Sequence, residues 1–148
     1  MTTEAPARPA PPSPPTHGTQ RRLAVDFDAA VARLPAALKA EGFGVITEID
    51  LAATFKAKLG VEFRNYRIFG ACNPSLAHRA LERDLSVGVL LPCNVVLYEG
   101  DDGVVTVGAV DPTKTLGGGA ADPELDALAR DVGERLSRVL TALEGATA

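Results

Sequence analysis

The chain has 148 residues, a formal net charge of −4 and a pI of about 5.1. This acidic balance argues against a nucleic-acid-binding protein, whose contact surface is normally basic. Two cysteines are too few for a disulfide framework, so we expect a reduced, cytoplasmic compartment. The longest uncharged stretch, residues 85–98, is shorter than the roughly 20 residues of a membrane-spanning helix, so we expect no membrane contact.

Residues 1–20 differ in composition from the rest of the chain. Six of the eleven prolines lie between Pro6 and Pro15, mixed with Ala, Ser and Thr. Such a segment has little to bury and favours an extended polyproline II form, which predicts a disordered N-terminal tail. The tail is either a ligand for another protein's groove or, more simply, inert. Residues 21–148 are expected to form a single domain.

The first half of the domain alternates short strands with helices. Alternating apolar residues over 21–25 predict a first strand. Apolar residues at steps of three and four predict a helix from Phe27 to Gly42 that continues, kinked, through Pro35. The next expected elements are a strand over 44–49, a short helix over 51–59 capped by Asp50, and a strand over 62–70.

A second helix-start signal stands at Asn73-Pro74, because Asn caps a helix and Pro suits its first position. The helix that follows is expected to bury Leu76 and Ala80 and to place His78 beside Glu82 on its other side. The remaining expected elements are one long strand over 87–99 with Pro92 at a bulge or an edge, a turn over 100–103, a strand over 104–110, a glycine linker over 117–119 and a long helix from Asp122-Pro123 to Gly145.

This order predicts an α+β domain with helices packed on a mainly antiparallel five-stranded sheet. Residues 95–98 and 104–107 do not alternate between apolar and polar, so both faces of that hairpin are expected to be covered. If the helices lie on one face, a second subunit covers the other. We therefore predict a homodimer.

The two cysteines are the main candidates for chemistry. Cys72 stands just before the Asn73 cap, where the positive helix end lowers the pKa of a thiol or attracts an anion. The simpler interpretation is that Cys72 packs as a small apolar residue. Cys93 lies in an apolar stretch, where burial would raise its pKa, and spacing alone gives no support to a disulfide between the two.

Other chemistry finds less support in the sequence. A metal needs three or four ligands, and only Cys72, Cys93 and His78 qualify in the domain, so we expect no metal and no cofactor. Glu48 and Asp50 share one face of a strand, as acid–base pairs do, but capping or exposure to solvent is simpler. Because no G-x-S-x-G and no phosphate-binding loop occurs, no catalytic residue is assigned, and a non-enzymatic role is favoured.

The runs GACNP at 70–74 and LPCN at 91–94, together with Glu48-Ile-Asp50, Tyr98-Glu99 and Asp111-Pro112, resemble the family called domain of unknown function 302. The resemblance covers roughly residues 27–116, to which the last helix can be added. It implies a small dimeric α+β protein with a β-α-β(4)-α layout, similar to the TATA-binding-protein fold, in which two short helices are insertions. The family supplies no activity, so it marks only motif positions to test.

Two functional hypotheses follow. The first is a homodimeric protein that binds a small anionic ligand or a partner protein. Its candidate residues are Cys72, Asn73, His78, Cys93 and Asn94. The alternative is a thiol-dependent redox or transfer enzyme that uses Cys72, with Cys93 as the resolving thiol.

Overall fold

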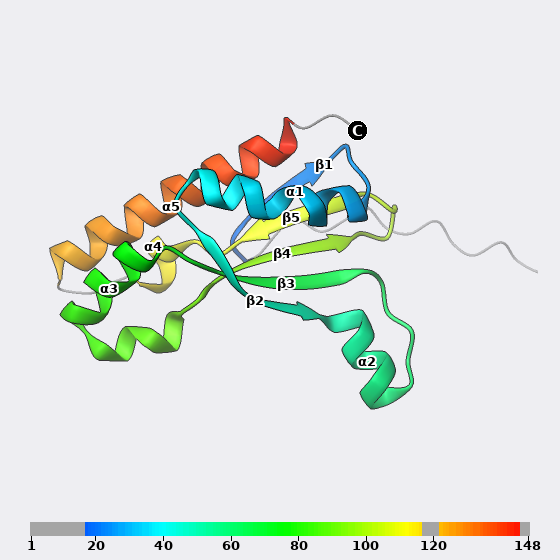
Figure 1. Cartoon of the computed structure of the whole chain (residues 1–148), viewed down its shortest axis with the longest axis horizontal. Coiled ribbons are helices and arrows are strands. Elements are labelled where there is room, and N and C mark those ends of the chain that lie inside the picture. The colour runs from blue at the N-terminus through cyan, green and yellow to red at the C-terminus, as the bar shows by residue number, and fades with distance from the viewer. Residues whose placement is uncertain (1–16, 117–121, 146–148) are drawn as a thin grey trace, which may run out of the picture.

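A five-stranded antiparallel sheet forms the centre of the protein, with strand order β1-β5-β4-β3-β2 (Figure 1). The computed structural model describes residues 17–116 and 122–145. In chain order the elements are β1 (Thr19–Leu23), α1 (Phe27–Ala40), β2 (Gly44–Asp50), α2 (Leu51–Leu59), β3 (Tyr66–Cys72), α3 (Pro74–Arg83), the 3-10 helix η1 (Leu85–Leu90), β4 (Cys93–Glu99), β5 (Val105–Ala109), α4 (Pro112–Thr115) and α5 (Pro123–Glu144). The predicted α+β class and five-stranded sheet are confirmed.

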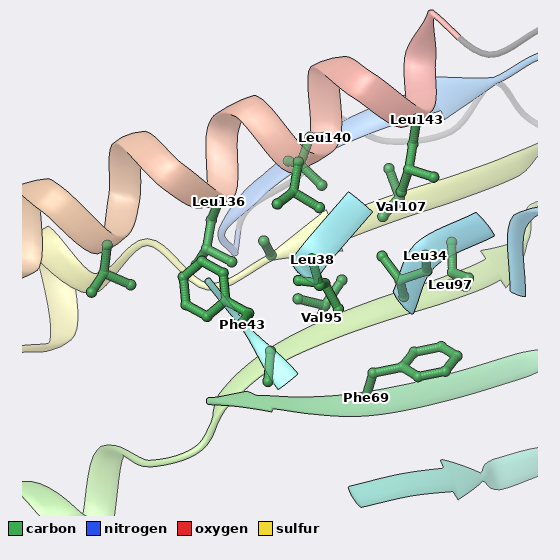
Figure 2. Packing of buried hydrophobic residues seen from close by; sticks show 14 of the residues in the cluster. Leu34, Leu38, Phe43, Phe69, Val95, Leu97, Val107, Leu136, Leu140 and Leu143 are labelled. Atoms are coloured by element: carbon green, nitrogen blue, oxygen red, sulfur yellow. The ribbon is translucent and has the colours of Figure 1, made fainter. Parts of the chain in front are cut away.

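Helices α1 and α5 lie on the same face of the sheet and form the core with it (Figures 1 and 2). Each buried Leu or Phe side chain contributes about 1.5–3 kcal/mol, so this layer dominates stability. The largest fully buried side chains are Leu34, Leu38, Phe69, Val95, Leu97, Val107, Leu136, Val139, Leu140 and Leu143. Pro35 is exposed, and α1 continues through it as one helix, as predicted. The kink expected at Pro35 stays a prediction.

Each of the five α-helices among the described residues begins at an Asp or Asn whose side chain accepts a backbone N–H. The predicted starts at Asp26, Asp50, Asn73 and Asp122 are confirmed. These caps satisfy N–H groups that have no partner within the helix, which is why sequence signals located them. The fifth cap, Asp111, follows the strand expected over 104–110 and starts the short helix α4, which was not predicted.

The predicted strand over 87–99 is wrong in its first half. Leu85–Leu90 form η1, whose cap Asp84 accepts the Ser86 N–H at 2.9 Å. Only Val87 of this segment is buried, whereas Leu85 is 86% exposed. Pro92 follows a cis peptide bond and precedes β4, which is the central strand, so Pro92 lies neither at a bulge nor on an edge strand. A short apolar run fits a strand or a helix equally well, which explains the error.

Three other boundaries differ from expectation. β3 begins at Tyr66 rather than 62, because residues 60–65 form a loop in which Phe63 packs on Phe55 with ring centroids 5.1 Å apart. β1 begins at Thr19, inside the segment expected to be a tail. Residues 1–16 and the predicted glycine linker at 117–119 lie outside the described residues. The insertions into the predicted β-α-β(4)-α layout are α2, α3, η1 and α4 rather than two helices.

The sheet has a second face, opposite α1 and α5, that we call the open face. Strand neighbours alternate between faces, so the residues between the core positions point here. The register places Gln20, Gly108, Val96, Ile68 and Ile49 in one row across this face. Edge strand β2 is largely exposed, and its register shifts at a bulge between Val45 and Thr47.

Candidate functional site

An apolar pocket of about 50 Å³ lies where the end of β3 and the start of β4 meet α3, and we call it the thiol pocket. Segments distant in sequence close it, including η1, α4 and α5. Its lining consists of Phe43, Ala71, Cys72, Asn73, Leu76, Ala77, Ala80, Leu90, Leu91, Pro92, Cys93, Val110, Pro112, Thr115, Leu116, Leu128 and Val132. None of these residues carries a charge. Three of the five predicted site residues, Cys72, Asn73 and Cys93, therefore line one pocket.

The sheet register brings the two thiols to the same end of the sheet. Cys72 is the last residue of β3 and pairs with Gly44, while Cys93 is the first residue of β4 and pairs with Ala71. Both thiols are free and half-buried. Burial, with a smaller contribution from the nearby Cys72, raises the pKa of Cys93 to about 11. Cys93 is therefore protonated at neutral pH, which makes it a weak nucleophile.

Asn73 is used by the fold. Its side-chain Oδ1 accepts the Leu76 N–H at 3.2 Å, and its backbone oxygen accepts the Ala77 N–H at 2.9 Å. Pro74 has no N–H group that needs a partner, and Asn73 accepts two of the N–H groups that follow. Few N–H groups therefore remain free at the start of α3. The Asn73 amide nitrogen also packs on Gly42, where a Cβ atom would approach it to 2.8 Å at a φ of +86°. Asn73 thus fixes both α3 and the turn that follows α1.

The two cysteine motifs pack on each other. A Cβ atom on Gly70 would overlap Thr47 Oγ1 and would lie 2.7 Å from Cγ of Pro92. The first residue of GACNP therefore lies under the proline of LPCN. An isolated Gly inside a strand often marks such a close approach, so this glycine is a signal that sequence reasoning missed.

Asn94 and His78, the other two predicted site residues, do not line the thiol pocket. Asn94 follows Cys93 on β4 and therefore points to the open face, where it lines a separate groove. His78 lies on the exposed side of α3, and its Nε2 is 3.3 Å from Glu82, as the helical spacing predicts. Of the predicted site residues, the structure thus brings together Cys72, Asn73 and Cys93.

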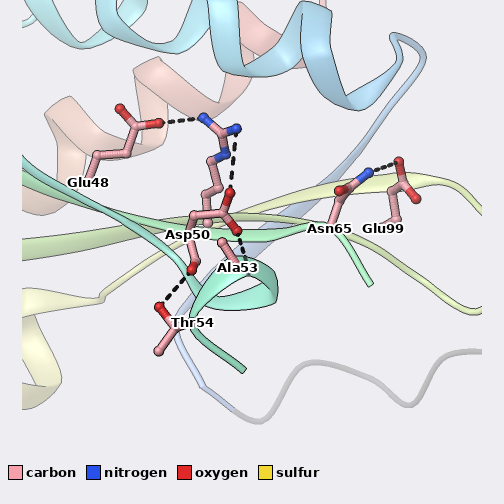
Figure 3. Close-up of polar contacts among 7 residues, drawn as sticks. Glu48, Asp50, Ala53, Thr54, Asn65 and Glu99 are labelled. Atoms are coloured by element: carbon pink, nitrogen blue, oxygen red, sulfur yellow. Dashed lines mark hydrogen bonds and ion pairs between the residues drawn. The ribbon is translucent and has the colours of Figure 1, made fainter. Parts of the chain in front are cut away.

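The paired carboxylates of β2 are held by an arginine from β3 (Figure 3). The Arg67 guanidinium lies 2.7 Å from Glu48 Oε1 and 3.7 Å from Asp50 Oδ2. Asp50 also accepts the Ala53 N–H at 2.9 Å and so caps α2. Both carboxylates are thus engaged in structural contacts, in agreement with the simpler of the two interpretations from sequence.

Within 17–116 and 122–145, no group of three or more His, Cys, Asp or Glu residues is arranged to hold a metal ion. Over the same part of the chain, no helix combines the length and apolar character needed to cross a membrane. No sequence pattern predicted that η1, α4 and α5 would close the thiol pocket. The lining brings together residues far apart in the chain, such as Leu90 and Leu128.

Comparison with known proteins agrees with this fold. The family model "Domain of unknown function DUF302" matches residues 19–143, a wider region than the predicted 27–116. The chain is similar to the crystal structure of an uncharacterized conserved DUF302 protein from Bacillus stearothermophilus, with 31% identity and a TM-score of 0.79 over 87% of this chain and 99% of that one. No curated protein matches the chain. The chain belongs to the DUF302 family, as the resemblance in its sequence implies.

Proposed function

We propose that this protein binds a small neutral molecule, or the apolar end of a larger one, in the thiol pocket. The observation that carries this proposal is the pocket's composition, because every lining residue is uncharged and most are aliphatic. Ligand sites in proteins are typically concave and mostly apolar, with few polar groups that set orientation. Here Cys72, Asn73 and Thr115 are the polar groups. The role is that of a binding or accessory protein.

The size of the pocket limits the ligand. A cavity of about 150 Å³ holds a benzene ring, so about 50 Å³ accommodates only a few heavy atoms. Leu90 at the pocket is 43% exposed and Leu116 is half-buried, so these side chains can shift to admit more of a chain. We therefore favour the end of an aliphatic chain over a planar ring.

The lining favours a neutral ligand over the anion expected from the helix start. Leu76 and Ala77 already donate their N–H groups to Asn73. An anion in this pocket would lose its hydration shell without gaining a cationic partner from the lining, which costs several kcal/mol. The anionic form of the hypothesis is therefore the weaker one.

Thiol-dependent chemistry is the second candidate function, because Cys72 and Cys93 line the same pocket. The raised pKa of Cys93 opposes a role as resolving thiol at neutral pH. If the pocket is a binding site, the two thiols serve as part of its wall rather than as reactive groups. The homodimer stays a prediction from the sequence.

A matched pair of ligands tests the proposal. 1-Hexanol and hexanoate share one alkyl chain and differ in charge, and methyl NMR of the Leu, Val and Ala side chains detects either one. We expect 1-hexanol to cause saturable shifts at residues lining the pocket and hexanoate to bind at least tenfold more weakly. Shifts that do not saturate with 1-hexanol would contradict the proposal, whereas equal binding of the two would show that only the alkyl end enters the pocket.

Two variants localise the effect. Ala77→Leu fills the pocket, whereas Ala57→Leu adds the same volume on the exposed side of α2. We expect Ala77→Leu to abolish the saturable shifts and Ala57→Leu to leave them unchanged. Loss of binding in both variants would show that the effect is not specific to the pocket.

A further inference from the structure

The open face carries a row of aromatic side chains, the aromatic row, which lies outside the thiol pocket. The rings of Tyr66 and Tyr98 stack with centroids 5.2 Å apart and planes within 7°. Phe63 continues the row at 6.3 Å from Tyr66, and Phe55 lies beyond it. At the other end, the Tyr98 hydroxyl donates to Gln20 Oε1 at 2.9 Å. The row therefore runs from α2 to β1 and is fixed at both ends.

A groove of about 510 Å³ lies along this face. Tyr66, Val96 and Tyr98 supply its apolar wall, and the exposed Asn94 amide adds hydrogen-bonding groups. This combination of aromatic rings and a polar amide is the surface on which Pro-rich peptides dock, because proline rings pack on aromatic faces while their carbonyls remain free to accept hydrogen bonds.

The groove begins where residues 1–16 join the domain. His17 and Gly18 line its β1 end. Gly18 has a φ of +65°, and a Cβ atom there would overlap the Ala109 carbonyl oxygen, so the chain turns at this point against β5. Residues 1–16, which precede His17, include six prolines between positions 6 and 15. A Pro-rich sequence is thus covalently attached at the mouth of an aromatic groove.

We propose that residues 1–16 of this chain bind the groove on the open face. The length is sufficient, because ten residues in polyproline II span about 31 Å, whereas five strands spaced about 4.8 Å apart are roughly 19 Å wide. Tethering favours this occupant over a second copy of the chain, because a short link gives an effective concentration in the millimolar range. The homodimer was predicted because this face of the sheet needed a cover. Residues 1–16 would supply that cover without a second subunit.

The two tyrosines make the test specific. Tyr66 and Tyr98 are the only tyrosines in the chain, so 3-fluorotyrosine places fluorine on the open face alone. Fluorine NMR of the full-length chain with a soluble gadolinium chelate then measures how accessible the two rings are. When the six prolines are replaced by serine, we expect the chelate to enhance fluorine relaxation at least threefold more than in the wild type, because the two rings become more accessible.

A control variant and a dilution series complete the test. Replacing Thr2, Thr3, Ser13 and Thr16 with alanine alters the same segment but keeps its prolines, so it should leave the enhancement unchanged. Protection should also be equal from 50 µM to 1 mM protein. Equal enhancement in the proline variant and the wild type would overturn the proposal. Protection that grows with concentration, together with a doubled mass in sedimentation, would assign the face to a second copy instead.

A measurement on the wild-type sequence gives a result that does not depend on whether the proline variant folds. Fluorine–proton NOEs should connect the rings of Tyr66 and Tyr98 with proline side chains of residues 6–15. Their absence contradicts the proposal without the use of any variant.

Discussion

The ring of Pro92 packs against the backbone of Gly70 so closely that a Cβ atom on Gly70 would lie 2.7 Å from Cγ of the proline. The two residues are far apart in sequence and belong to the two cysteine motifs, GACNP and LPCN. Their contact holds the end of β3 against the chain that enters β4. It thus fixes the backbone that carries Cys72 and Cys93.

Replacing Gly70 with alanine should destabilise the protein. The added methyl group would overlap Thr47 Oγ1 and press on Pro92, and such overpacking typically costs about 1–3 kcal/mol. Gly44→Ala is the matched control, since a Cβ atom on this β2 glycine meets nothing within 4 Å. Urea denaturation should show a loss of about 2 kcal/mol for Gly70→Ala and less than 0.5 kcal/mol for the control. Equal losses would mean that the contact is not the cause.

The protonated Cys93 thiol predicts a specific loss of stability at high pH. Its pKa rises from 9.0 to about 11 on folding, so above pH 9 the unfolded chain loses this proton while the folded protein retains it. The stabilisation is therefore fully present below pH 9 and is lost as the pH rises through 11. The difference between the two pKa values corresponds to a loss of up to about 3 kcal/mol.

The control for this prediction removes the thiol. Cys93→Ala should show a smaller decline in the free energy of unfolding between pH 8 and pH 11 than the wild type, because it lacks the thiol whose pKa is raised by folding. Parallel declines in the two proteins would show that the Cys93 pKa is not raised by folding.

The cap at Asn73 predicts a substitution series. Asn73→Ala removes the acceptor for the Leu76 N–H and should cost about 1 kcal/mol. Asn73→Ser keeps a capping oxygen and should recover most of that loss. Chemical denaturation of the three proteins measures both steps. If serine is no better than alanine, the contact with Gly42, rather than the cap, accounts for the effect of Asn73.

The parts of the structure that the sequence predicted correctly depend on neighbouring residues. The helix starts at Asp26, Asn73 and Asp122 were predictable because a cap is a bond within three residues. The hairpin turn at 100–103 is equally local, with the Gly103 N–H donating to the Gly100 carbonyl at 3.0 Å. Local chemistry was thus enough for most of the element order and the α+β class.

The parts that could not be predicted depend on distant contacts. The apolar run over 85–92 fits a strand as well as a helix, and only the packing of Val87 and Pro92 in three dimensions decides between them. The candidate site was incomplete for the same reason. Cys93 and Asn94 were grouped as one motif, but consecutive strand residues point to opposite faces, so the structure separates them.

The bulge in edge strand β2 has a consequence for behaviour at high concentration. An exposed edge strand offers free N–H and C=O groups onto which a strand from another molecule can add, which is how sheets grow into fibres. In β2 the register shifts between Val45 and Thr47, and the strand ends directly at the cap of α2. An incoming strand would lose alignment within a few residues. The sheet is thereby protected against aggregation at this edge.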